Sequence, residues 1–109
     1  MPKSFSSLSE FYPYYLSEHQ NGTCRSLHFF GSLLVIGVVS TCLATQEFQW
    51  IWTALLAGYG PAWIGHFVFE KNRPATFKHP FYSFVSDWLM FKDILLRRIP
   101  LLGPLKLSL

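Results

Sequence analysis

The sequence predicts an all-α fold, a small integral membrane protein in which two spanning helices form a hairpin. Of its 109 residues, 50% are hydrophobic and only 14% are charged, whereas soluble domains carry about 25% charged residues. Residues 28–45 and 48–69 form two apolar runs without a formal charge, each close to the roughly 20 residues that cross a bilayer. We therefore expect one domain, residues 1–109, with an amphipathic helix before the hairpin and an interfacial helix after it.

The N-terminal helix is predicted from a cap and a repeating apolar face. Residues 7–10 read S-L-S-E, a capping-box pattern. One face then recurs at helical spacing through Leu8, Phe11, Tyr12, Tyr15, Leu16 and His19. Pro13 predicts a kink, because proline removes a backbone hydrogen bond. The Asn-Gly pair at 21–22 ends this helix, and Thr23 is the candidate N-cap of the next one.

The two spans are joined by the short polar turn Q-E at 46–47. In the second span Ala54, Gly58 and Ala62 recur every four residues, a pattern of small residues that lets membrane helices approach closely. The Gly-Pro pair at 60–61 predicts a kink in this helix.

The positive charges indicate the orientation of the hairpin. Lys3 and Arg25 precede the first span, and Lys71, Arg73 and Lys78 follow the second, while the turn carries none. The positive-inside rule then places both termini in the cytoplasm, at a bacterial inner membrane or the endoplasmic reticulum.

The C-terminal part, residues 81–99, keeps apolar residues at near-helical spacing. Charged residues interrupt every apolar stretch there: Asp87, Lys92, Asp93, Arg97 and Arg98. A helix lying in the membrane interface therefore fits better than a third span.

The net charge narrows the class of partner, and the spacing of the two cysteines indicates whether they form a disulfide. The net charge of +3 is modest and no basic stripe with interleaved aromatics is present, so nucleic acid is excluded as a partner and membrane lipid is expected. Cys24 and Cys42 would lie roughly 27 Å apart along one helix, too far for a disulfide, and are predicted to be free thiols.

All four histidines are predicted to gather at one end of the hairpin. The numbers of His28 and His66 average 47, which falls in the turn, so an antiparallel hairpin places both at the same depth. His19 ends the preceding helix on its apolar face, and His79 lies in a loop that could fold back. Neutral imidazole binds Zn, Fe, Cu or Ni, and the nearby carboxylate of Glu70 could complete such a set. We therefore predict a metal site.

Each of these residues also has a simpler interpretation. A single histidine at a membrane interface is commonly a structural, hydrogen-bonded residue. Glu70 is a natural partner for Lys71 or Arg73. The sequence is equally compatible with three roles for His79: a metal ligand, a residue that supports a ligand, or a residue with no part in the site.

Two blocks carry a resemblance to a known family: FYPYYLSEHQNGTCRSLHFFG (11–31) and GYGPAWIGHFVFEKNRPATF (58–77). Together they resemble the fungal endoplasmic-reticulum dioxygenase of 2-hydroxy fatty acids and its small bacterial relatives. The resemblance implies an Fe(II) enzyme that uses O2 to shorten a 2-hydroxy fatty acid by one carbon. It implies iron ligands at His19, His28 and His66, with Glu70 and Asn72 as the other catalytic residues beside His66. The resemblance does not extend to His79, which is predicted as a fourth ligand from the hairpin geometry alone. Lys71 or Arg73 would steady the substrate carboxylate.

Two rival functions remain open at this point. One is a non-catalytic membrane protein whose histidines cap and pair at the interface. The other is a lipid hydrolase that uses zinc instead of iron. Di-iron membrane desaturases are excluded, because they use about eight histidines and this chain has four.

Overall fold

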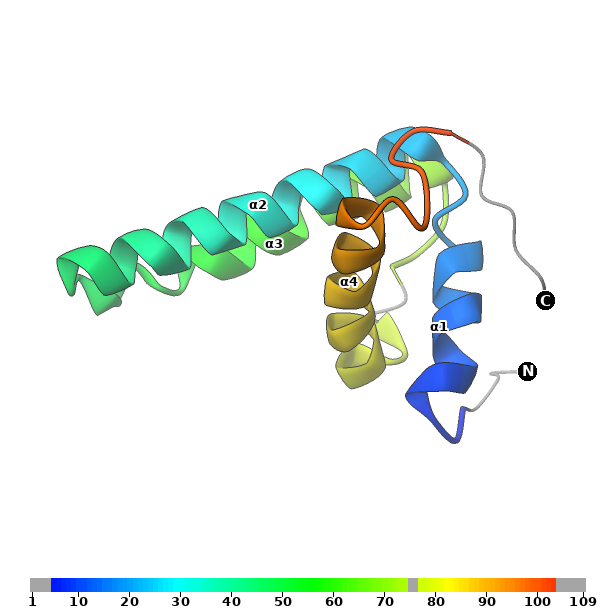
Figure 1. Cartoon of the computed structure of the whole chain (residues 1–109), viewed down its shortest axis with the longest axis horizontal. Coiled ribbons are helices and arrows are strands. Elements are labelled where there is room, and N and C mark those ends of the chain that lie inside the picture. Colours follow the sequence, from blue (N-terminus) through cyan, green and yellow to red (C-terminus); the bar gives the residue numbers. More distant parts are fainter. Residues whose placement is uncertain (1–4, 75–76, 104–109) are drawn as a thin grey trace.

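The computed structural model describes residues 5–74 and 77–103, and every regular element in those ranges is helical. The elements are α1 (Leu8–Ser17), α2 (Gly22–Thr45), the 3₁₀ turn η1 (Phe48–Trp50), α3 (Thr53–Ile64), the π-helical turn η2 (Gly65–Glu70) and α4 (Pro80–Leu95). Figure 1 shows α2 and α3 side by side as a long arm, with α1 and α4 lying across one end of it. The predicted all-α class is confirmed.

The helix α1 begins and packs as its sequence predicts. The side chain of Ser7 accepts a hydrogen bond from the backbone N–H of Glu10 at 3.2 Å, and Pro13 lies inside the helix. The buried face of α1 packs against α4 in a core made of Phe11, Tyr15, Leu16, Met90 and Ile94. This core fixes the two short helices to each other.

The helix α2 starts earlier than predicted. Asn21, and not Thr23, is its N-cap, and the Asn21 side chain accepts from the N–H of Cys24 at 3.1 Å. The helix thus begins two residues before the predicted start, and His28 lies in its second turn in either case. Within the described residues, α2 is the one helix long and apolar enough to cross a membrane.

The second predicted span is not confirmed as one continuous helix. Residues 48–69 are divided among η1, α3 and η2. Pro61 inside α3 cannot donate a backbone hydrogen bond, and four residues later the helix widens into the π-helical turn. Such π-turns are frequent at functional sites, and this one contains His66.

The small residues of α3 face α2, as predicted. A Cβ added to Gly31 of α2 would lie 2.9 Å from the carbonyl oxygen of Gly58, and one added to Gly58 would lie 3.0 Å from Cγ2 of Val35. Ala62, one turn further on, is buried. The two helices therefore touch nearly backbone to backbone.

The helix α4 is shorter than the predicted interfacial helix at 81–99 and has a buried face. Ser83, Ser86, Met90 and Ile94 of α4 are buried, whereas Phe81 and Phe84 are exposed. Because α4 contacts both α1 and α2, it packs as a tertiary element over the inner end of the arm.

Candidate metal centre

Three of the four histidines meet where α1, α2 and η2 converge. His19 follows α1, His28 lies in α2 and His66 lies in η2. Their ring centroids are 4.4, 4.5 and 4.8 Å apart, with every pair of rings nearly perpendicular. All three side chains are buried. Three imidazoles from distant points of the chain therefore share one enclosed space.

Two of these rings are held in a single tautomer by backbone carbonyls. Nδ1 of His19 lies 2.6 Å from the carbonyl oxygen of Tyr15, and Nδ1 of His28 lies 2.9 Å from that of Cys24. A carbonyl oxygen can only accept, so each Nδ1 carries the proton. Each Nε2 is left with a lone pair.

The third ring, His66, is fixed through the amide of Asn72. The Asn72 Nδ2 group donates to the carbonyl oxygen of Glu18 at 3.1 Å, which leaves Oδ1 as the acceptor side of the amide. That Oδ1 lies 2.6 Å from Nδ1 of His66, so Nδ1 must be the donor. His66 thus has the same tautomer as the other two rings, and its Nε2 carries a lone pair.

The arrangement of the lone pairs fits a metal cation. Nε2 of His19 lies 3.1 Å from Nε2 of His28, and two unprotonated nitrogens at that distance repel each other. Two nitrogens about 2.1 Å from one ion lie roughly 3.0 to 3.4 Å apart for ligand angles between about 90° and 109°. A cavity of about 10 Å³ is lined by all three rings, close to the space of a single small sphere. The tautomers of all three histidines, and the spacing of His19 and His28, therefore match a metal site.

The environment also keeps His19 neutral. Burial lowers the pKa of His19 well below its usual range, and the neighbouring imidazoles of His28 and His66 lower it further. The ring of Tyr15 stacks on it at a centroid distance of 4.1 Å. His19 is therefore in the state that a metal ligand requires.

Cys24 is a fourth ligand-type residue in the same cluster and was not predicted. Its ligand atom and those of the three histidines all lie within 4.8 Å of one another. The sulfur is 3.8 Å from Nδ1 of His28, so it lies beside the nitrogen that faces away from the other rings. The i, i+4 spacing of Cys24 and His28 in one helix was the sequence signal for this neighbour.

Gly65 explains how η2 comes so close to α2. A Cβ added to Gly65 would lie 3.0 Å from Sγ and 3.1 Å from Cα of Cys24. Any side chain at this position would push η2 outward, and His66, the next residue, would move with it.

Glu70 and Asn72 support the cluster from the side. The Glu70 carboxylate accepts from the backbone N–H of Asn21 at 2.6 Å, so it holds the start of α2 and faces a backbone group instead of a histidine. Asn72 links His66 to Glu18 at the end of α1. The G-H-x-x-x-E-x-N string thus ties η2 to the junction of α1 and α2.

Arg25 belongs to the same junction, and it is not the surface charge that the orientation argument assumed. It is fully buried. Its guanidinium donates to four carbonyl oxygens: those of His19 at 2.9 Å, Gln20 at 3.0 Å, Pro100 at 3.1 Å, and Gly103. These bonds satisfy a buried cation without a carboxylate and fix the backbone at His19.

The remaining predicted residues lie outside the cluster. His79 is the N-cap of α4, and its ring packs against Phe5 and Phe11 at centroid distances of 5.3 Å. Lys71 and Arg73 are exposed, just beyond η2. The structure brings together His19, His28, His66 and Asn72, but it does not bring His79 to them.

Asp87 of α4 is a further residue that sequence reasoning missed. It accepts a hydrogen bond from the hydroxyl of Tyr15, and burial raises the pKa of Asp87 to about 7. It lines the small cavity beside the three histidines. A half-buried carboxyl group with a raised pKa beside the rings is a second unusual ionisable group at this site.

Comparison with known proteins identifies the family. The model of the 2-hydroxy-palmitic acid dioxygenase Mpo1-like family matches residues 5–99. No curated protein and no solved structure matches the chain. The matched range contains all three histidines of the cluster and the residues that orient them, and covers most of the chain. The protein therefore belongs to the Mpo1-like family, whose description is that of a 2-hydroxy-palmitic acid dioxygenase.

Proposed function

We propose that this protein is an Fe(II)-dependent dioxygenase that shortens 2-hydroxy fatty acids by one carbon with O2. The observation that carries the proposal is the set of three Nε2 lone pairs around one small cavity, in a chain of the Mpo1-like family. Non-haem iron oxygenases commonly hold the ion on one face with two histidines and one carboxylate and leave the other positions open. In this chain a third histidine would take the place of the carboxylate. A 2-hydroxy acid offers a carboxylate and a hydroxyl for such positions.

His19, His28 and His66 would hold the iron. When bound, iron supplies the redox chemistry that joins O2 to the organic substrate. The protein orients the three rings through Tyr15, Cys24 and Asn72, and it excludes water, because these side chains are buried or half-buried. Support of this kind from the groups behind the ligands raises metal affinity by about 10- to 100-fold per group.

Lys71 and Arg73 would bring the acidic substrate to the site. Both are exposed and follow η2 directly, where their charges attract a carboxylate from the membrane surface. They act before binding and do not touch the reacting atoms.

We further propose that the arm of α2 and α3 lies in the membrane, with both termini on the cytoplasmic side. Large apolar side chains cover its surface, among them Leu33, Ile36, Leu43, Trp50, Trp52, Leu55 and Leu56. In this arrangement η1, α3 and η2 together form the return span. A fatty acid dissolved in the bilayer would then reach the cluster without crossing water.

The test is metal analysis of anaerobically purified protein, followed by oxygen uptake with 2-hydroxyhexadecanoate. We expect one iron per chain and a product with fifteen carbons. His66→Ala should remove both the bound iron and the turnover. Zinc with O2-independent lipid hydrolysis would instead support the hydrolase, and protein without stoichiometric metal would support a structural role for the histidines.

A further inference from the structure

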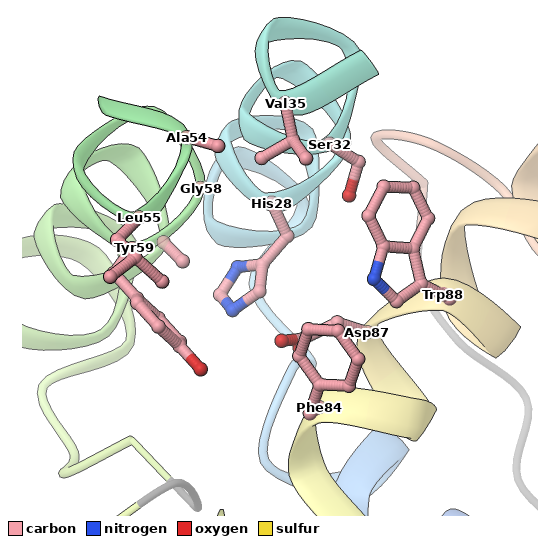
Figure 2. Close-up of a pocket in the computed structure, with 11 residues that line it drawn as sticks. His28, Ser32, Val35, Ala54, Leu55, Gly58, Tyr59, Phe84, Asp87 and Trp88 are labelled. Atoms are coloured by element: carbon pink, nitrogen blue, oxygen red, sulfur yellow. The ribbon is translucent and has the colours of Figure 1, made fainter. Parts of the chain in front are cut away.

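An apolar pocket opens beside the histidine cluster, between α2, α3 and α4. Its volume is about 150 Å³. Most of its wall is apolar, with Val35 from α2, Leu55 and Gly58 from α3, and Phe84 and Trp88 from α4. Figure 2 shows these side chains around one open space, with the imidazole of His28 reaching into it.

The pocket adjoins the small cavity of the candidate metal centre. His28, Tyr59, Ala62 and Asp87 line both this pocket and the small cavity between the three histidines. In Figure 2 the hydroxyl of Tyr59 and the carboxylate of Asp87 lie at the same end as the ring of His28. The pocket therefore has a polar inner end at the cluster.

The pocket also reaches the surface of the molecule. Leu55 and Phe84 form part of its wall and are 63% and 54% exposed. Both are large apolar side chains; Leu55 belongs to the arm proposed to lie in lipid, and Phe84 belongs to α4. The pocket thus leads from an apolar rim to the polar groups at the cluster.

The outer groove between α2 and α3 is larger but does not compete for this role. It has a volume of about 450 Å³ and lies toward the turn, between Leu33 and Trp50. It shares no lining residue with the histidine cavity. A molecule bound there would be separated from the cluster.

We propose that the pocket between α2, α3 and α4 binds the first carbons of the substrate's alkyl chain and thereby directs its carboxyl end to the cluster. This inference rests on the proposed function. A cavity of about 150 Å³ holds benzene, so this pocket accommodates about six carbons. The rest of the chain extends past Leu55 and Phe84 into lipid. Binding should therefore strengthen with each carbon up to about eight in total and change little beyond that.

Ala54 provides the variant that fills the pocket. It lines the pocket from α3 and is not a member of the histidine cluster. Ala54→Leu places three more carbons in the space and should lower kcat/KM for 2-hydroxyhexadecanoate by about tenfold to a hundredfold. Turnover of 2-hydroxybutanoate, which has almost no chain to accommodate, should fall much less than that of 2-hydroxyhexadecanoate. Ala44→Leu is the matched control, because Ala44 is an exposed residue of the same arm away from the pocket.

A direct readout that needs no turnover is cross-linking. The full-length protein is loaded with Zn²⁺, which has no redox chemistry, and exposed to 2-hydroxyhexadecanoate that carries a diazirine at carbon 5. Mass spectrometry should locate the cross-links on Leu55, Phe84 or Trp88, and Ala54→Leu should reduce them at least fivefold relative to Ala44→Leu. Cross-links in the outer groove, or equal labelling of both variants, would overturn the proposal.

The two proposals fail in different ways. If the unmodified protein cross-links in the pocket but consumes no O2 with any 2-hydroxy acid, the pocket stands and the dioxygenase assignment falls. If it turns over 2-hydroxyhexadecanoate but Ala54→Leu and Ala44→Leu are equally active, the reaction stands and the pocket is wrong.

Discussion

The inner and outer halves of the α2–α3 arm come from the same two segments but differ in what their side chains meet. In the outer half, Leu43, Trp50 and Leu56 are more than half exposed. In the inner half, Cys24, Arg25 and His66 are almost completely buried, although two of them are polar. The outer half thus presents an apolar surface, whereas the buried polar side chains of the inner half depend on individual hydrogen bonds. Substitutions should therefore change stability and metal binding little in the outer half of the arm and strongly in the inner half.

The largest effect is expected when a histidine of the cluster is removed. His28→Ala leaves two imidazoles around the cavity, and metal content and oxygen uptake should both fall to background. Leu43→Ala in the outer half should keep both, because its side chain is 61% exposed. Metal analysis and oxygen uptake of the two variants measure the contrast, and iron retained by His28→Ala would contradict it.

A smaller effect is expected at Asn72, which touches His66 from behind. Asn72→Ala removes the acceptor that fixes the tautomer of His66, and metal affinity should fall about 10- to 100-fold. Asn72→Asp keeps an acceptor for His66 and loses only the donor to Glu18, so it should bind metal more tightly than Asn72→Ala. Competition with a chelator of known affinity measures the order, and equal affinities would show that the contact does not tune the site.

Substitutions at two glycines compare how the inner and outer halves of the arm contribute to the free energy of unfolding. Gly65→Ala drives a methyl group into Cys24 and should lower the free energy of unfolding by about 1 to 3 kcal/mol. Gly37→Ala in α2 meets nothing within 4 Å and should raise it by about 0.5 to 1 kcal/mol, because alanine favours the helix. Thermal unfolding of both variants in the same detergent gives the signs. A neutral Gly65→Ala would show that η2 can move away from α2.

The last expected effect is a pH dependence at Asp87, which is spread over several pH units. Its pKa in the folded protein is about 7, above the roughly 3.9 of an unfolded chain, so the folded state binds more protons between these values. The unfolding free energy should therefore fall by at most about 1.4 kcal/mol per pH unit as pH rises through this window and level off above pH 7. Asp87→Asn still accepts from Tyr15 and should lack this slope. Denaturant titrations of the metal-free proteins at pH 5 and pH 8 compare the two, and parallel profiles would contradict the assignment.

The sequence predicted the meeting of His28 and His66 because depth in a hairpin follows directly from residue numbers. It also predicted the apolar face of α1 and the close contact at Gly58, since both follow from helical periodicity. The π-turn at His66 was not predictable in this way, because it depends on how the chain after Pro61 meets α2. The prediction of one continuous second span is not confirmed, because residues 48–69 are divided among η1, α3 and η2.

Residues whose role depends on distant partners were the ones that sequence reasoning misplaced or missed. Arg25 looked like a loop charge, and only the carbonyls of residues 19–20 and 100–103 show why it is buried. Asp87 looked like an interruption of an apolar face, but its partner is Tyr15, 72 positions earlier. His79 had the right chemistry, and its place at the start of α4 keeps it among aromatic rings.

The guanidinium of Arg25 depends on residues that lie beyond the range matched by the family model. The family match stops at residue 99, yet two of the four oxygens around this cation belong to Pro100 and Gly103. A chain truncated after residue 99 would leave the buried Arg25 guanidinium with two of its four carbonyl partners, next to the backbone of His19. Residues 100–103 therefore support the backbone behind the candidate metal centre, and truncation there should loosen His19, some eighty positions away in sequence.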